Sequence, residues 1–156
     1  MFREMRRSDK LKTVNETIEI LNACTNGVLS VNGEKGYPYG VPVSYVYNEN
    51  QIIFHCALTG YKLDSIKKDP KVSFCVVGAD NINAAAFTTV YKSVICFGKA
   101  HIVDGDEEKE EILKRIVKKY SAEYYDDGMD YMKQMWGKTA CVVIDIEHMT
   151  GKGLAK

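Results

Sequence analysis

Six short runs rich in Val, Ile, Phe and Tyr, set apart by turn residues, constrain the fold of this chain more than any other feature of its sequence. The runs are 27–32, 37–47, 51–57, 71–77, 90–103 and 141–146. With short helices between them, they predict an α+β protein with a mainly antiparallel sheet. Pro38 and Pro42 cannot donate to a ladder and indicate an edge or a bulge, and Gly98 indicates a further bulge. Strands of such uneven length favour a small six-stranded barrel over a flat open sheet.

Helical spacing of apolar residues appears between and around these runs. The predicted helices are 13–24, 60–69, 106–120 and 124–136. Thr13 and Glu16 have the form of a capping box, in which each side chain satisfies a free backbone amide at the start of a helix. Asp106 is expected to cap a helix that carries acidic residues in its first turns and lysines in its last. Residues 78–89 follow neither period, and we expect them to form a mobile loop.

Composition limits the classes of protein that the chain can represent. Its 156 residues suit one domain, expected to cover 1–156. Lys and Arg together number 21, and Asp and Glu together also number 21, so the formal net charge is zero. This balance argues against general binding to nucleic acid or a membrane surface. The five cysteines are odd in number and form no CxxC motif, which favours free thiols in a reducing compartment. Without a signal peptide or an apolar run of about 18 residues, we expect a cytoplasmic protein.

The motifs of several common enzyme classes are incomplete. Gly137-Lys138-Thr139 has the ending of a P-loop, but Met132 stands where the motif needs its first glycine. No GxGxxG motif follows a strand, so a Rossmann cofactor site has no support. The histidines, which are His55, His101 and His148, lie in or beside different strands without a partner at metal-ligand spacing. We therefore expect no bound metal.

The segment from His55 to Ile66 carries the clearest chemistry. A strand ends on His55, a turn containing Gly60 follows, and Lys62 stands at the start of a helix. An ammonium group, helix-start amides, the Thr59 hydroxyl and an imidazole together suit a phosphate group. A plain alternative is a turn that needs Gly60 for its backbone and carries a surface lysine.

Two further segments are candidates for binding. Tyr91 and Ser93, with other hydroxyl residues and a lysine, precede the apolar part of the fifth run, where an ordinary strand start is the alternative. The second run contains Pro42, Val43 and Ser44, and its prolines leave backbone groups free to meet the polar edge of a flat heterocycle. Protection of an edge strand is the alternative there.

Read together, these segments resemble the FMN-binding split-barrel family, the pyridoxamine 5′-phosphate oxidase-like group, and within it the nitroimidazole-resistance (Nim-type) branch. The matching pieces, in order, are Arg6-Arg7-x-Asp9, 36–45, 54–62, 70–74, 91–100, Lys119-Tyr-Ser and 145–152. Each piece is weak alone, but seven in one order are specific. The resemblance covers nearly the whole chain and implies a split-barrel homodimer with FMN at the subunit interface.

The resemblance also implies roles for individual residues. Lys62 would be the main phosphate ligand, with His55, Gly60, Tyr91 and Ser93 beside it. The backbone of Pro42, Val43 and Ser44 would border the isoalloxazine. Trp136 would stack on the flavin or serve as a buried interface aromatic, and Lys152 would reach a phosphate across the dimer or lie in a solvated tail.

The activity implied by the resemblance is that of a flavin-dependent oxidoreductase, in which reduced FMN passes hydride or electrons to a small flat acceptor such as a nitro-heterocycle. In such proteins the flavin carries the chemistry, and the protein orients and shields it. No side chain is a convincing general acid, and no catalytic residue is assigned. The chain lacks a clear set of basic residues for pyridoxal phosphate, so oxidation of vitamin B6 is not expected. The alternative is an FMN or haem carrier or sensor without turnover.

Overall fold

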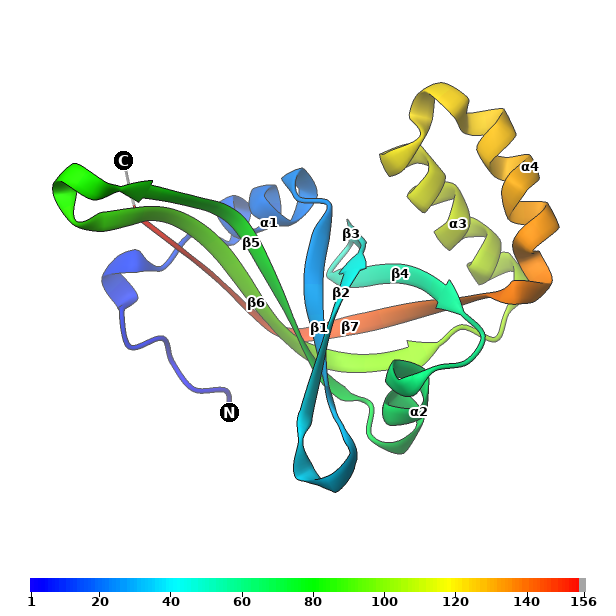
Figure 1. Cartoon of the computed structure of the whole chain (residues 1–156), viewed down its shortest axis with the longest axis horizontal. Helices are drawn as coiled ribbons and strands as arrows, with labels where there is room; N and C mark the ends of the chain where they lie inside the picture. Colours follow the sequence, from blue (N-terminus) through cyan, green and yellow to red (C-terminus); the bar gives the residue numbers. More distant parts are fainter. Residues whose placement is uncertain (155–156) are drawn as a thin grey trace.

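The computed structural model describes residues 1–154, which form one antiparallel sheet with helices around it (Figure 1). The strands are β1 (Asn26–Asn32), β2 (Pro38–Ser44), β3 (Val46–Asn48), β4 (Gln51–Ala57), β5 (Lys71–Asn83), β6 (Thr88–Ile102) and β7 (Thr139–Gly153). The α-helices are α1 (Val14–Ala23), α2 (Tyr61–Lys68), α3 (Asp106–Tyr120) and α4 (Tyr125–Met135). The predicted α+β class is confirmed.

The order of strands in the sheet explains its barrel-like curvature. The order is β2-β1-β5-β6-β7-β4-β3, so β2 and β3 form the two outer edges. These edge strands follow each other in sequence with only Tyr45 between them. The chain therefore passes from one edge of the sheet to the other through a single residue, which brings the edges together without pairing them. This open arrangement is consistent with the expected split barrel.

The sheet has seven strands rather than the six predicted. The run expected as one strand over 37–47 divides at Tyr45, because its first part pairs with β1 and its last part pairs with β4. The prediction of an edge strand at Pro42 is confirmed, since β2 pairs on one side only. The β6–β7 pairing shifts register between Phe97 and Gly98, so a bulge does lie beside Gly98, but its extra residue is Glu147 of β7 and not a residue of β6.

Residues 78–89 do not form the predicted loop. Most of them extend β5 and β6 into a long two-stranded arm that projects from the sheet, and Ala84–Ala86 form a short 3-10 turn at its tip (Figure 1). The segment lacks the alternation of a half-buried strand because both faces of the arm are largely exposed, with Ile82 and Phe87 almost fully so. Backbone pairing, and not burial, therefore defines these residues as strands.

The helices lie close to their predicted positions. The capping box at the start of α1 is confirmed: the Thr13 side chain accepts a hydrogen bond from the Glu16 amide, and the Glu16 carboxylate accepts one from the Thr13 amide. The expectation for Asp106 was wrong in detail, because Gly105 is the N-cap of α3 and provides no side-chain bond. Within 1–154 no helix is both long and apolar enough to cross a bilayer.

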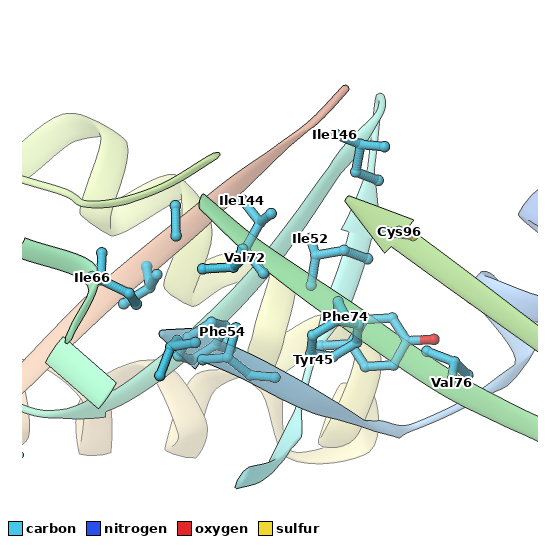
Figure 2. Close-up of a cluster of buried hydrophobic side chains, with 14 of the residues drawn as sticks. Tyr45, Ile52, Phe54, Ile66, Val72, Phe74, Val76, Cys96, Ile144 and Ile146 are labelled. Atoms are coloured by element: carbon cyan, nitrogen blue, oxygen red, sulfur yellow. The ribbon is translucent and has the colours of Figure 1, made fainter. Parts of the chain in front are cut away.

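Two groups of buried side chains stabilise the fold. The larger group fills the inside of the curved sheet and includes Tyr45, Phe54 and Phe74, and Figure 2 shows the rings of Tyr45 and Phe74 beside each other. Their ring centroids are 5.1 Å apart in an edge-to-face arrangement, a geometry that aromatic pairs favour. The smaller group lies between α3 and the outer side of β4 and β7, and includes Ile53 and Leu113. All five cysteines are free thiols, as predicted.

Candidate functional site

Three of the predicted phosphate ligands lie on β4, α2 and the turn that connects them. His55 lies near the end of β4, Gly60 is the N-cap of α2, and Lys62 occupies the first turn of that helix. Gly60 has a φ of 145°, in the range that favours glycine, and a Cβ atom there would meet nothing within 4 Å. This explains why the turn needs a glycine and leaves open space in front of the helix.

The charges at this junction suit an anion. Among residues 1–154, Lys62 forms no ion pair, so its ammonium group is free. The first amides of a helix have no acceptor within the helix and carry its positive end. Burial raises the pKa of the Cys56 thiol, and the nearby Lys62 ammonium opposes that rise. Residues 60–62 therefore have the charge and the donor groups that suit an anion such as phosphate.

His55 places a neutral imidazole on the α4 side of β4, on the strand face opposite to that of Cys56. Desolvation by surrounding protein atoms lowers its pKa below the ordinary value of 6.5. Its side chain lines a pocket of about 290 Å³ between the end of β4 and helix α4, whose walls include Tyr131, Met132 and Met135. A neutral imidazole can donate one hydrogen bond to a phosphate oxygen and accept another.

The three residues expected at the isoalloxazine lie on an edge strand. Pro42, Val43 and Ser44 form the end of β2, where they pair with Val28, Gly27 and Asn26 of β1. The side chains of Pro42 and Ser44 are exposed, whereas Val43 packs toward the larger core. An edge strand leaves one row of backbone groups unpaired, and these groups are available to the polar edge of a heterocycle.

The remaining predicted phosphate ligands gather elsewhere. Ser93 of β6 lies directly opposite Lys152 of β7, and the Lys152 ammonium lies 5.5 Å from the centre of the Tyr91 ring. Lys152 belongs to a strand and not to a solvated tail, since β7 runs to Gly153. These three residues form a second cluster near the base of the β5–β6 arm.

The two clusters lie at opposite ends of β7. His55 pairs with Cys141 at the start of this strand, and Ser93 pairs with Lys152 near its end. Cys141 and Lys152 are eleven positions apart in β7, which corresponds to roughly 35 Å along a strand. Within one chain, the predicted ligands therefore do not form a single phosphate site.

Trp136 belongs to neither cluster. It lies in a 3-10 turn after α4 and packs against the smaller core group. The Lys109 ammonium donates a hydrogen bond of 2.8 Å to the Trp136 carbonyl and lies 4.6 Å from the centre of its ring. The Trp136 ring is therefore partly buried against the smaller core group.

An exposed face on the outside of the sheet was not predicted from the sequence. Pairing places five side chains next to one another across β2, β1, β5, β6 and β7, in the order Pro42, Val28, Cys75, Ile95 and Thr150. Val28 and Ile95 are 40% and 42% exposed. Phe97, in the neighbouring row, is 41% exposed and stacks with Phe2. We call these seven residues the outer face. The alternation of β1 and β6 contains this signal, but strand order decides that the residues are neighbours.

Among residues 1–154, no three His, Cys, Asp or Glu side chains gather in a way that could hold a metal ion.

No curated protein matches the sequence. Solved structures do resemble the fold. A candidate 5-nitroimidazole antibiotic resistance protein from Bacteroides thetaiotaomicron VPI-5482 superimposes with a TM-score of 0.77 at 18% identity, covering 92% of this chain and 85% of that one.

Two other solved structures are equally similar in shape. The conserved hypothetical protein Rv2991 from Mycobacterium tuberculosis has a TM-score of 0.82 at 21% identity, with 96% of this chain and 90% of that chain covered. The flavocytochrome Anf3 from Azotobacter vinelandii has a TM-score of 0.81 at 17% identity, with 99% and 73% covered. At these identities the likeness shows a shared fold.

A sequence model of the family described as pyridoxamine 5′-phosphate oxidase matches residues 13–153, from the cap of α1 to the last residue of β7. The match includes β2, the β4–α2 junction and the β6–β7 pairing described above. It agrees with the resemblance found in the sequence motifs and with the solved structures. The chain therefore belongs to the pyridoxamine 5′-phosphate oxidase-like family.

Proposed function

We propose that this chain binds FMN as a homodimer and passes electrons or hydride from the reduced cofactor to a small flat acceptor such as a nitro-heterocycle. One observation carries the proposal: the predicted ligands form two clusters at opposite ends of β7, with Lys62 in one and Lys152 in the other. A second copy of the chain could bring the cluster of one protomer to that of its partner. Membership in the family and the flavocytochrome with the same fold support a flavin as the ligand.

The outer face supports the dimer. It includes the half-exposed apolar residues Val28, Ile95 and Phe97, and contact between two copies would remove them from water. Pro42 belongs to this face, and Ser93 lies two residues before Ile95 on the same side of β6. An interface here would therefore lie next to both the flavin-edge residues and the second cluster. The formal net charge of zero offers little repulsion against such self-association.

In the proposed site, each residue has a role that its position allows. The Lys62 ammonium and the first amides of α2 would bind the phosphate, and His55 would donate a hydrogen bond to it. Backbone groups of Val43 and Ser44 would fix the edge of the ring system. FMN would supply the redox chemistry when bound. The pocket beside His55, with the Met132 and Met135 side chains, offers apolar surface to a small aromatic acceptor.

Absorption spectroscopy of the purified protein tests this proposal. We expect the protein to contain bound flavin, either retained from purification or acquired from added FMN. NADH or NADPH should bleach the flavin absorption, and a nitroimidazole should then restore it by reoxidising the flavin. A protein that remains colourless with FMN would contradict the flavin assignment. A Soret band would favour haem, and flavin that no nicotinamide reduces would favour a carrier.

Sedimentation equilibrium should give twice the mass of one chain, and a monomer at micromolar concentration would contradict the shared site.

A further inference from the structure

The corner at Tyr45, where the chain crosses from one sheet edge to the other, is held by the end of α3. Tyr45 is fully buried, and its hydroxyl donates a hydrogen bond of 2.7 Å to the Leu21 carbonyl of α1. Lys119 lies 4.5 Å from the centre of the Tyr45 ring and donates a hydrogen bond of 2.6 Å to the Cys24 carbonyl. The corner is thus fixed to elements that are distant in sequence.

The Tyr120 hydroxyl contacts the backbone of this corner directly. It accepts a hydrogen bond of 3.0 Å from the Tyr45 amide. Two carbonyl oxygens lie within hydrogen-bond distance of the Tyr120 oxygen, that of Tyr45 at 2.6 Å and that of Thr25 at 2.5 Å, and the single hydroxyl proton is shared between these acceptors. Because Thr25 precedes β1 and Tyr45 follows β2, the hydroxyl reinforces the end of the β1–β2 ladder, where the Tyr45 amide also donates a hydrogen bond of 3.3 Å to the Thr25 carbonyl.

That end of the ladder needs support. β2 is an edge strand, and Pro42 within it has no amide proton to donate. Strand ends with few backbone hydrogen bonds open most readily. Val43 and Ser44 lie between this proline and the corner, where they pair with Gly27 and Asn26. At the corner itself, the shorter of the two hydrogen bonds from the Tyr45 amide goes to the Tyr120 hydroxyl, at 3.0 Å, and the other goes to the Thr25 carbonyl, at 3.3 Å.

We propose that Tyr120 is a positioning residue for the cofactor, whose hydroxyl holds the corner so that the backbone of Val43 and Ser44 keeps the geometry that the flavin edge requires. The inference rests on the proposed binding of FMN. By this inference, α3 affects the environment of the isoalloxazine ring, although it does not line the predicted phosphate site. The effect acts through the backbone and needs no contact between Tyr120 and the cofactor.

The test compares Tyr120→Phe with two controls. Tyr120→Phe keeps the ring and removes only the hydroxyl. Tyr124→Phe makes the same chemical change at a residue that is 66% exposed. Val117→Ala weakens α3 by removing buried methyl groups one turn before Tyr120. FMN affinity, the visible spectrum of the bound flavin and its reduction potential are measured on all four proteins at a temperature where each is folded.

The expected result is that Tyr120→Phe weakens FMN binding by about fivefold or more, the equivalent of one hydrogen bond, and shifts the flavin spectrum and potential. The two controls should match the wild type, even though Val117→Ala lowers stability. Wild-type values in Tyr120→Phe, or an equal loss of affinity in Val117→Ala, would overturn the inference and leave the binding of FMN intact. Failure of the wild type itself to bind FMN would overturn both proposals.

Discussion

The Tyr61 hydroxyl accepts a hydrogen bond of 2.6 Å from the Glu34 amide, which joins the start of α2 to the connection between β1 and β2. The Tyr61 ring also lies against Tyr39 of β2, with 4.4 Å between ring centroids. Lys62 follows Tyr61 directly, so the residue next to the proposed phosphate ligand is fixed to the strand that is expected to border the flavin.

Tyr61→Phe should reduce the free energy of unfolding. The substitution removes the hydrogen bond and keeps the contact with Tyr39. We expect a loss near the lower end of about 0.5–1.5 kcal/mol, because Tyr61 is 39% exposed and water can bind the freed amide. Urea denaturation measures this change. Tyr37→Phe is the control, since Tyr37 is 75% exposed, and an equal effect in both variants would contradict the role of the hydroxyl.

Lys62→Ala should weaken the binding of FMN. A charge-assisted hydrogen bond to a phosphate contributes about 1.5–3 kcal/mol, so the dissociation constant should rise between roughly tenfold and a hundredfold. Titration of FMN fluorescence measures it, and the loss should shrink at high salt. Lys67→Ala on the exposed side of the same helix is the matched control. Equal affinities in the two variants would remove Lys62 from the phosphate site.

The sequence predicted local structure better than the relations between distant segments. The spacing of apolar residues identified β4 and α3 with their observed bounds, because these elements bury one face in a regular period. It could not predict the break at Tyr45, since that break depends on different pairing partners on either side. The arm formed by 78–89 was missed for a similar reason: its residues are paired but exposed.

The same limit applies to the candidate site. Gly60 and Lys62 were predictable because a glycine turn and a helix start are local features, and the structure places both at one junction. The distance between Lys62 and Lys152 was not predictable, because it depends on the length and register of β7. Tyr120 was missed as a contact of the β2 corner, since 75 residues separate it from Tyr45.

His55 should titrate below its ordinary pKa in the absence of cofactor. Desolvation lowers the pKa of the folded state from 6.5, so the unfolded chain binds more protons and stability falls as the pH decreases through 6.5 toward the folded value. Above pH 6.5 His55 is neutral in both the folded and the unfolded chain, so it causes no loss of stability there. Histidine NMR signals measure the titration, and His55→Gln should remove this part of the pH dependence. Added FMN should raise the pKa, because a phosphate dianion favours the imidazolium. An unchanged pKa would place His55 away from the phosphate.

Gly98→Ala should destabilise the sheet at the bulge between β6 and β7. A Cβ atom at Gly98 would collide with the Asp145 backbone oxygen on β7, and the Ile144 side chain lies close by. Backbone atoms of a central strand cannot move aside without losing ladder hydrogen bonds, so we expect a loss of at least about 1–3 kcal/mol in the free energy of unfolding. Gly137→Ala is the control, because a Cβ atom there would meet nothing within 4 Å and its φ is not positive. Urea denaturation of both variants tests the prediction. A Gly98→Ala protein as stable as Gly137→Ala would show that the two strands can separate at the bulge, and that the register joining Ser93 to Lys152 is less fixed than the pairing indicates.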